Sequence, residues 1–200
     1  SDTITVNNAA GAVINGAVGG TNGLIKEGTG KLTLAGTNTY TGTTSVNTGT
    51  LEVNGSIAAG STVAVGTAGT LSGTGTINGN ATVTGSGAIN LGIGGNIVGN
   101  LTVDGGLWNG VGTVGGDVNV NSGNLSIGSG ANLTTNGTMN VSGTATFSGA
   151  DATSKLTGNL NVTSAANFSF VGEITGVATT VTRNSPGYHL NLKGANSYGG

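Results

Sequence analysis

The sequence lacks the residues on which several protein classes depend. It has no Cys and one Pro among 200 residues, which excludes a disulfide-stapled secreted domain and, despite 42 Gly, a collagen. Charged residues make up 6% of the chain and the formal net charge is −2, so no strong field is available to hold nucleic acid or an anionic membrane. No apolar run approaches the roughly 18 residues of a transmembrane helix. We therefore expect neither nucleic acid nor a lipid surface as a direct partner.

The residues that fill the space between the glycines favour β-sheet. They are chiefly Thr, Val, Asn, Ile and Leu, and hydrophobic residues reach 35% of the chain. Apolar residues at helical spacing are nowhere sustained, and glycines recur along the sequence. The composition therefore predicts an all-β protein with no helices.

A valine recurs along the chain at intervals of 17 to 21 residues, about 19 on average. Apolar and polar side chains alternate around these valines, which predicts short strands with one buried and one solvent-facing side. A Gly stands four residues before most of them, as Gly99 stands before Val103. We take eight valines as core anchors: Val46, Val65, Val83, Val103, Val120, Val141, Val162 and Val181.

Short strands on a constant period predict a parallel β-solenoid, with residues 1–200 as a single segment of it. One coil buries too little apolar surface to fold alone, so stability must come from the stacking of neighbouring coils. About ten coils at about 4.8 Å each would form a rod about 50 Å long. We expect Gly at the coil corner because the position needs either a positive φ or a close approach of the adjacent coil.

Residues 23–55 carry an ordered series of short motifs. They are Lys-Glu-Gly at 26–28, Leu-Thr-Leu at 32–34, Gly-Thr-Asn-Thr-Tyr-Thr-Gly at 36–42 and Gly-Thr-Leu-Glu-Val at 49–53. In this order they closely resemble the passenger-associated transport repeat of bacterial autotransporter passengers. Residues 188–200 resemble the start of a second copy, because 189–200 keep both Leu, the first Gly, Asn, Tyr and the last Gly of 31–42.

The resemblance implies a right-handed β-helix that is exported from a Gram-negative bacterium and displayed at, or released from, the cell surface. It implies that the repeat assists secretion and folding, and that the outer membrane is met only through a C-terminal barrel of the same gene product. The absence of Cys suits export, because a disulfide-closed loop is bulky in a narrow pore.

We expect a structural stalk that mediates adhesion or self-association, and not an enzyme. Its expected partners are further copies of itself, end to end or side by side, and glycans or proteins on host or bacterial surfaces. Open coil ends favour the end-to-end contact, because they expose unpaired β edges. The alternatives are a fragment of a polysaccharide-acting β-helical enzyme, and an inert spacer for a binding domain elsewhere.

Few residues could carry chemistry. His189 is the only His and takes the place of Lys31 in the first repeat, an outward strand position. Asp104 and Asp117 lie on adjacent coils but are offset by about 13 Å along the strand, whereas glycosidase carboxylates lie about 5 to 9.5 Å apart. Trp108 should face outward, where it could stack on a sugar or cover a coil edge. We therefore expect no catalytic residue, no metal and no cofactor.

The polar positions beside the anchors form the most extended surface feature. Neutral Thr and Asn side chains repeated on every coil either join into hydrogen-bonded ladders or form a flat, low-charge face for another copy. An ice-binding face would need Thr-x-Thr on each coil, and among these positions only Thr82 and Thr84 provide it. The candidate contact face consists of Thr82, Thr84, Thr102, Asp104, Asn119, Asn121, Asn140, Ser142, Asn161 and Thr163.

Overall fold

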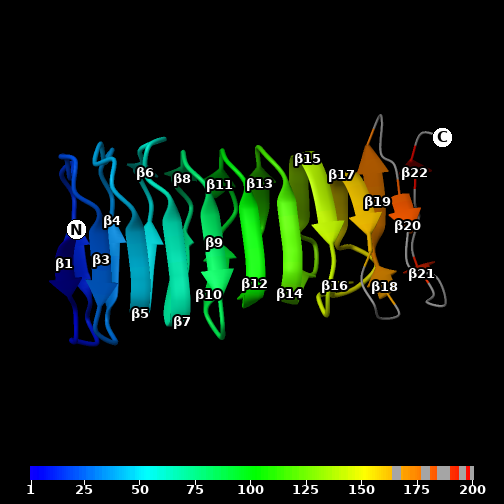
Figure 1. Ribbon diagram of the computed structural model, residues 1–200, viewed down its shortest axis with the longest axis horizontal. Coiled ribbons are helices and arrows are strands. Elements are labelled where there is room, and N and C mark those ends of the chain that lie inside the picture. Colours follow the sequence, from blue (N-terminus) through cyan, green and yellow to red (C-terminus); the bar gives the residue numbers. More distant parts are fainter. Residues whose placement is uncertain (164–167, 177–180, 184–189, 194–196, 199–200) are drawn as a thin grey trace.

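The protein is a parallel β-solenoid, as the sequence predicted. The computed structural model describes residues 1–163, 168–176, 181–183, 190–193 and 197–198, and within these residues it contains strands and no helix. Every strand pairing is parallel, and the coils follow the sequence along the long axis of the molecule (Figure 1). The prediction of an all-β solenoid of stacked coils is confirmed.

Each coil contributes strands to as many as three ladders, which we call faces A, B and C. Face A joins ten strands of the described chain, so nine steps of about 4.8 Å give it a length of about 43 Å. Its strands are β1 (Asp2–Thr5), β3 (Leu24–Glu27), β5 (Thr44–Val53), β7 (Val63–Gly73), β9 (Ala81–Thr84), β12 (Leu101–Trp108), β14 (Val118–Ile127), β15 (Asn132–Val141), β17 (Lys155–Val162) and β20 (Val181–Arg183).

Face B follows face A around the coil. It consists of β2 (Ala12–Ile14), β4 (Lys31–Leu34), the ends of β5 and β7, β10 (Ala88–Leu91), the ends of β12 and β14, and β16 (Thr146–Gly149). Beyond it, β18 (Phe168–Val171) and β21 (Leu190–Lys193) pair in a separate sheet. The rings of Phe147 and Phe170 stack at 4.7 Å and so connect the two sheets.

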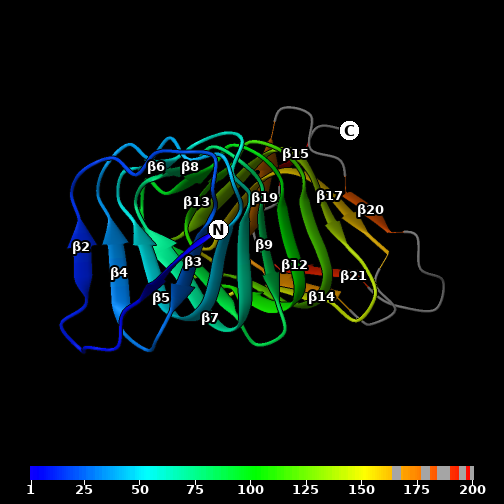
Figure 2. The same cartoon turned by 60° about the vertical axis from the view of Figure 1, so that its left-hand side comes forward.

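Face C closes the coil. Its strands are β6 (Ser56–Ile57), β8 (Thr76–Ile77), β11 (Asn96–Ile97), β13 (Gly112–Val114), the starts of β15 and β17, β19 (Glu173–Gly176) and β22 (Ser197–Tyr198). When the molecule is turned by 60°, β2 and β4 stand on a different side of the coil from β3 (Figure 2). The three faces enclose one continuous apolar core.

The core consists of columns of like side chains, because paired residues in a parallel ladder lie directly above one another. On face A the anchors pair in succession, Val46 with Val65 and so on to Val162, and all seven are at most 1% exposed. Each fully buried valine or leucine stabilises the fold by about 1.5–3 kcal/mol relative to an exposed one. Val181 differs from the expectation, because it pairs with Leu160 while Arg183 pairs with Val162.

The corner from face C to face A explains the Gly that stands four residues before most of the anchors. Gly99 has no positive φ, but a Cβ added there would lie 2.8 Å from the carbonyl carbon of Gly79 and would overlap Oδ1 of Asn80. That Oδ1 accepts a hydrogen bond of 2.8 Å from the backbone N–H of Asn100. Close approach of the neighbouring coil, rather than a positive φ, therefore requires Gly at this position.

The same corner contact continues along the rod. Oδ1 of Asn100 accepts from the N–H of Asp117 at 2.9 Å, and Oδ1 of Asp117 accepts from the N–H of Thr138 at 2.8 Å. At the corner from face A to face B, Gly49 combines both requirements, because its φ is 66° and a Cβ there would lie 2.6 Å from the carbonyl oxygen of Gly30.

Candidate functional site

Buried polar side chains gather in the coils near the N-terminal end. Among the described residues, the buried polar or charged ones are Lys26, Thr33, Asn38, Thr44, Ser61, Thr135 and Ser154. Five of these seven lie between residues 26 and 61, and Tyr40 lies among them with 2% exposure. Burial of a polar group costs free energy unless the group finds a partner, so this concentration needs an explanation. We call Lys26, Asn38, Tyr40, Thr44 and Ser61 the polar clasp.

Lys26 enters the core where the next coil has an anchor valine, because it is in register with Val46. Its side chain is fully buried. Its Nζ donates to the carbonyl oxygens of Glu27 and Gly28, each at 2.8 Å, and to that of Thr48 on the next coil at 3.2 Å. Burial lowers the pKa of Lys26, and the Glu27 carboxylate opposes this shift. The ammonium group therefore joins two coils at the corner between faces A and B.

Asn38 joins three successive coils. Its Nδ2 donates to the carbonyl oxygen of Gly36 in its own coil at 3.0 Å and to that of Ser56 in the next coil at 2.9 Å. Its Oδ1 accepts a hydrogen bond of 3.0 Å from the backbone N–H of Val18 in the preceding coil. Asn38 is 1% exposed, so water does not replace these partners. The amide keeps all three hydrogen bonds only when the three coils stack in this order.

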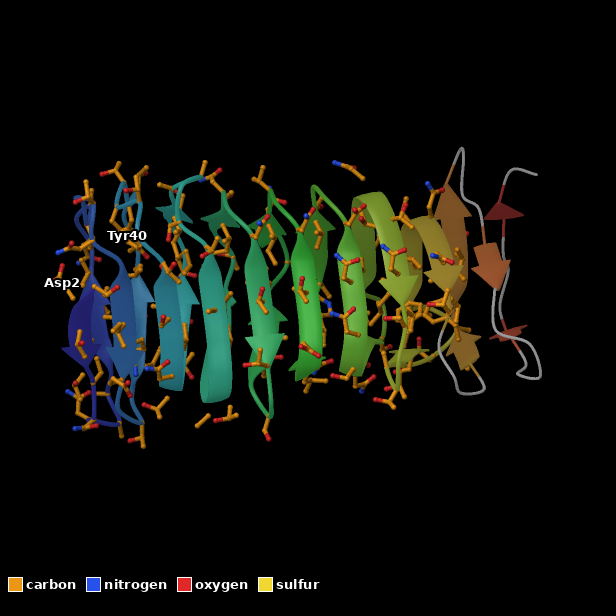
Figure 3. All side chains as sticks on the ribbon, viewed as in Figure 1. Asp2 and Tyr40 are labelled. Atoms are coloured by element: carbon orange, nitrogen blue, oxygen red, sulfur yellow. The ribbon has the colours of Figure 1, made fainter. Side chains whose placement is uncertain are left out.

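Tyr40 starts a chain of hydroxyl contacts at the corner from face C to face A (labelled in Figure 3). Its hydroxyl shares a hydrogen bond of 2.7 Å with Thr44, and Thr44 shares one of 3.2 Å with Ser61. Ser61 in turn donates to the carbonyl oxygen of Gly42 at 2.7 Å. Burial raises the pKa of Tyr40, while the hydrogen bond with Thr44 opposes the shift. This chain connects the corner glycine of one coil to the next coil.

Charged side chains outside the core add contacts between the same coils. Oε2 of Glu52 accepts from the hydroxyl of Thr33 at 2.8 Å and lies 3.1 Å from Nζ of Lys31. The hydrogen bond from Thr33 is the largest cause of the lowered pKa of Glu52, burial opposes the shift, and Lys31 lowers the pKa further. On face A, Glu27 accepts from Nδ2 of Asn47 at 2.6 Å. Each of these contacts joins neighbouring coils.

The contacts of the clasp join neighbouring coils. Within the described ranges no group of three or more His, Cys, Asp or Glu could hold a metal ion. Asp104 accepts from Ser122 at 2.9 Å and Asp117 from a backbone N–H, so each carboxylate serves a contact between coils. His189 lies outside the described residues, and of 188–200 only β21 and β22 are described.

The candidate contact face lies on the outer side of face A. Asn140 donates to Asn119 at 3.0 Å and Asn161 donates to Asn140 at 3.2 Å, which makes an asparagine ladder across three coils. Thr82 pairs in register with Thr102, and Thr102 with Asn119. Beside this column lie Thr84, Asp104, Asn121 and Thr163, all exposed, and Ser142, which is partly buried. The polar face is thus a set of stacked columns whose Asn members hydrogen-bond one another.

Trp108 is buried, contrary to the prediction that it faces outward. It is 0% exposed and pairs with Ile89 and Leu125, so it belongs to the Leu and Ile column of face B, while Leu107 is only partly buried. The ring fits because Gly110 has no side chain, and a Cβ there would lie 3.1 Å from Cζ2 of the indole. A sugar cannot stack on Trp108 in this position.

The sequence motifs and the clasp coincide. Residues 24–53 match the family model of the passenger-associated transport repeat. The segment is thus similar to a transport repeat. The match confirms the resemblance to autotransporter passengers, and it covers Lys26, Asn38, Tyr40 and Thr44 of the clasp. No curated protein and no solved structure matches the chain.

A β-solenoid with such a repeat fits the stalk of an autotransporter passenger domain. Among the described residues, no helix has the length and apolar character needed to cross a membrane. Sequence reasoning missed the burial of Lys26, Asn38 and Tyr40, although all three stand inside the motifs that identified the repeat. Polar residues at fixed places in a repeat were the available indication of a structural role.

Proposed function

We propose that this chain is a structural stalk of an autotransporter passenger that is exported by a Gram-negative bacterium, exposed at its surface, and associates with further copies of itself. The observation that carries the proposal is the transport repeat built into an uninterrupted solenoid. The stacked coils give a rod with stability distributed along its length, which suits a spacer that holds partners away from the cell.

The clasp supports a role of the repeat in folding during export. Coils of similar length and composition can stack in the wrong order, because one valine column resembles the next. A buried Lys26 or Asn38 penalises a wrong order, since its side-chain nitrogen then loses the carbonyl partner on the next coil. The repeat would thus set the order of stacking for the coils that adjoin it.

Low charge supports self-association rather than attraction to a charged partner. Between Val53 and Ala150 the only charged residues are Asp104 and Asp117. Two rods can therefore lie side by side over this length with little repulsion between like charges.

Display of this segment on bacteria, fused to an unrelated outer-membrane anchor, tests the proposal. We expect the cells to clump, and we expect soluble segment added in excess to disperse them. The matched control is an anchor that displays an unrelated solenoid of similar length. Cells that stay dispersed and that bind no glycan would leave the inert spacer as the function.

A further inference from the structure

A hollow lies along the turns that lead from face B to face C. Its volume is about 390 Å³, which falls in the range of small-molecule sites. Three successive turns contribute to it: residues 92–95 after β10, 109–111 after β12 and 128–131 after β14. Strands β13 and β15 complete the lining, which includes Ile93, Val111, Thr113, Ser129, Asn132 and Thr134.

The two longer turns give the hollow a fixed shape. In each of them the N–H of the fourth residue donates to the carbonyl oxygen of the first, at 2.9 Å in 92–95 and at 3.1 Å in 128–131. The third residue is a Gly with a positive φ, 90° at Gly94 and 67° at Gly130. The hollow is therefore formed before any ligand arrives, which lowers the entropic cost of binding.

Hydroxyl and amide groups form the polar side of the hollow. Nδ2 of Asn132 donates to Oγ1 of Thr134 at 3.2 Å, and the hydroxyl of Ser129 lies 3.4 Å from that of Thr153. Asn132 and Ser129 are both exposed, and hydroxyl and amide groups each donate and accept hydrogen bonds. A ligand rich in hydroxyl groups is complementary to this side, because its groups also donate and accept.

Ile93 forms an apolar side of the same hollow. It holds the second place in its turn, as Ser129 does in the turn two coils on, and Val111 lies in the turn between them. Ile93 is 88% exposed, and Val111 is partly buried. A sugar ring has the same division, since its faces carry C–H groups and its rim carries hydroxyls. One apolar and one polar side therefore match a saccharide better than they match a purely apolar ligand.

The charges around the hollow favour a neutral ligand. None of the described residues that line it is charged. The carboxylate of Asp151 adjoins the lining, where hydrogen bonds from Ser129 and Thr153 lower its pKa. Its negative charge disfavours phosphate, sulfate and uronic acid groups, and the described lining holds no cation to pair with them.

We propose that this hollow binds a neutral saccharide, with C–H groups of a sugar ring against Ile93 and Val111 and its hydroxyls toward Ser129 and Asn132. The site goes beyond the proposed self-association and does not depend on it. No aromatic ring is found among the described lining residues, so the affinity of one site is low. Many copies on a cell surface raise the affinity for a polysaccharide that reaches several sites.

Saturation-transfer difference NMR with the purified chain tests this site. The probes are maltoheptaose and cellohexaose, which are neutral, and an oligogalacturonate, which is anionic. We expect saturation transfer to a neutral probe and none to the oligogalacturonate. Ile93→Ala and Asn132→Ala truncate exposed side chains on the two sides of the hollow, and each should raise the Kd of the neutral probe about fivefold. The matched control Asn121→Ala truncates an exposed Asn on face A and should change this Kd by less than about twofold.

The outcomes decide the saccharide site separately from self-association. Absence of saturation transfer to both neutral probes at their solubility limit overturns the site, even if displaying cells clump. Equal transfer to the oligogalacturonate contradicts the neutral class of ligand. Binding that neither hollow variant weakens lies elsewhere on the rod and also overturns the site. A far-UV circular dichroism spectrum like that of the wild type shows that a raised Kd comes from the hollow and not from unfolding.

Discussion

Replacement of Gly99 by Ala tests whether coil stacking at the corner depends on the missing side chain. The new Cβ would displace Oδ1 of Asn80 and break its hydrogen bond to the N–H of Asn100. Loss of that hydrogen bond costs about 1–3 kcal/mol. Crowding against the backbone of Gly79 costs about 1–3 kcal/mol more. We expect Gly99→Ala to lower the free energy of unfolding by about 2–6 kcal/mol.

The matched control is Gly66→Ala. A Cβ at Gly66 would meet nothing closer than 3.6 Å, and its φ is not positive, so the added methyl group fits. We expect a change within about 1 kcal/mol, on the stabilising side, because Ala restricts the unfolded chain. With a larger side chain, Gly99→Val should destabilise the fold far more than Thr102→Val, since Thr102 lies on the outer side of its strand.

Urea unfolding followed by far-UV circular dichroism measures these differences, provided that the slope of the transition is unchanged. The double variant Asn80→Ala, Gly99→Ala should be less destabilised than the sum of the two single variants, because the displaced oxygen is already absent. A Gly99→Ala protein with the stability of the Gly66→Ala protein would refute the reasoning. It would show that the corner has room and that the glycine spacing has another cause.

Three further predictions concern buried or partly buried groups. Lys26→Met keeps the core volume, so it should lower the free energy of unfolding by about 2–5 kcal/mol less than Lys26→Ala does. Because folding lowers the pKa of Lys26, the free energy of unfolding of the wild type should rise relative to that of Lys26→Met as pH rises toward the ordinary Lys pKa. Folding lowers the pKa of Glu52, so Glu52 stabilises the fold above its ordinary pKa, and this stabilisation is lost as pH falls through the folded pKa. Thr33→Val removes the largest cause of the shift and should reduce this loss of stability in acid, measured by unfolding at a series of pH values. Because Trp108 is buried, it should emit blue-shifted fluorescence that iodide does not quench. Trp108→Phe should cost less stability than the about 3–5 kcal/mol of Trp108→Ala, because Nε1 of Trp108 finds no acceptor among the described residues and its loss breaks no hydrogen bond. Red-shifted, quenchable emission would contradict the burial.

Strict alternation along the sequence does not predict which side chains face the core beyond a β-bulge, and Trp108 is the example. Val103 points inward and Asp104 outward, but the strand register shifts between Asp104 and Leu107. One extra residue reverses which side chains face the core, because the period of a strand is two. Leu107 therefore lies outside and Trp108 inside.

The sequence by itself determined the period, the alternation and the transport repeat, and these suffice for a parallel solenoid with a valine column. Such features are local or repetitive, and stacking of near-identical coils leaves the hydrophobic pattern only one way to be buried. Tertiary structure alone decided which side chains meet across coils: that Lys26 reaches the carbonyl oxygen of Thr48, that Val181 pairs with Leu160, and that Ile93 stands beside a hollow. These depend on coil lengths that differ by a few residues, and only packing in three dimensions converts such differences into contacts.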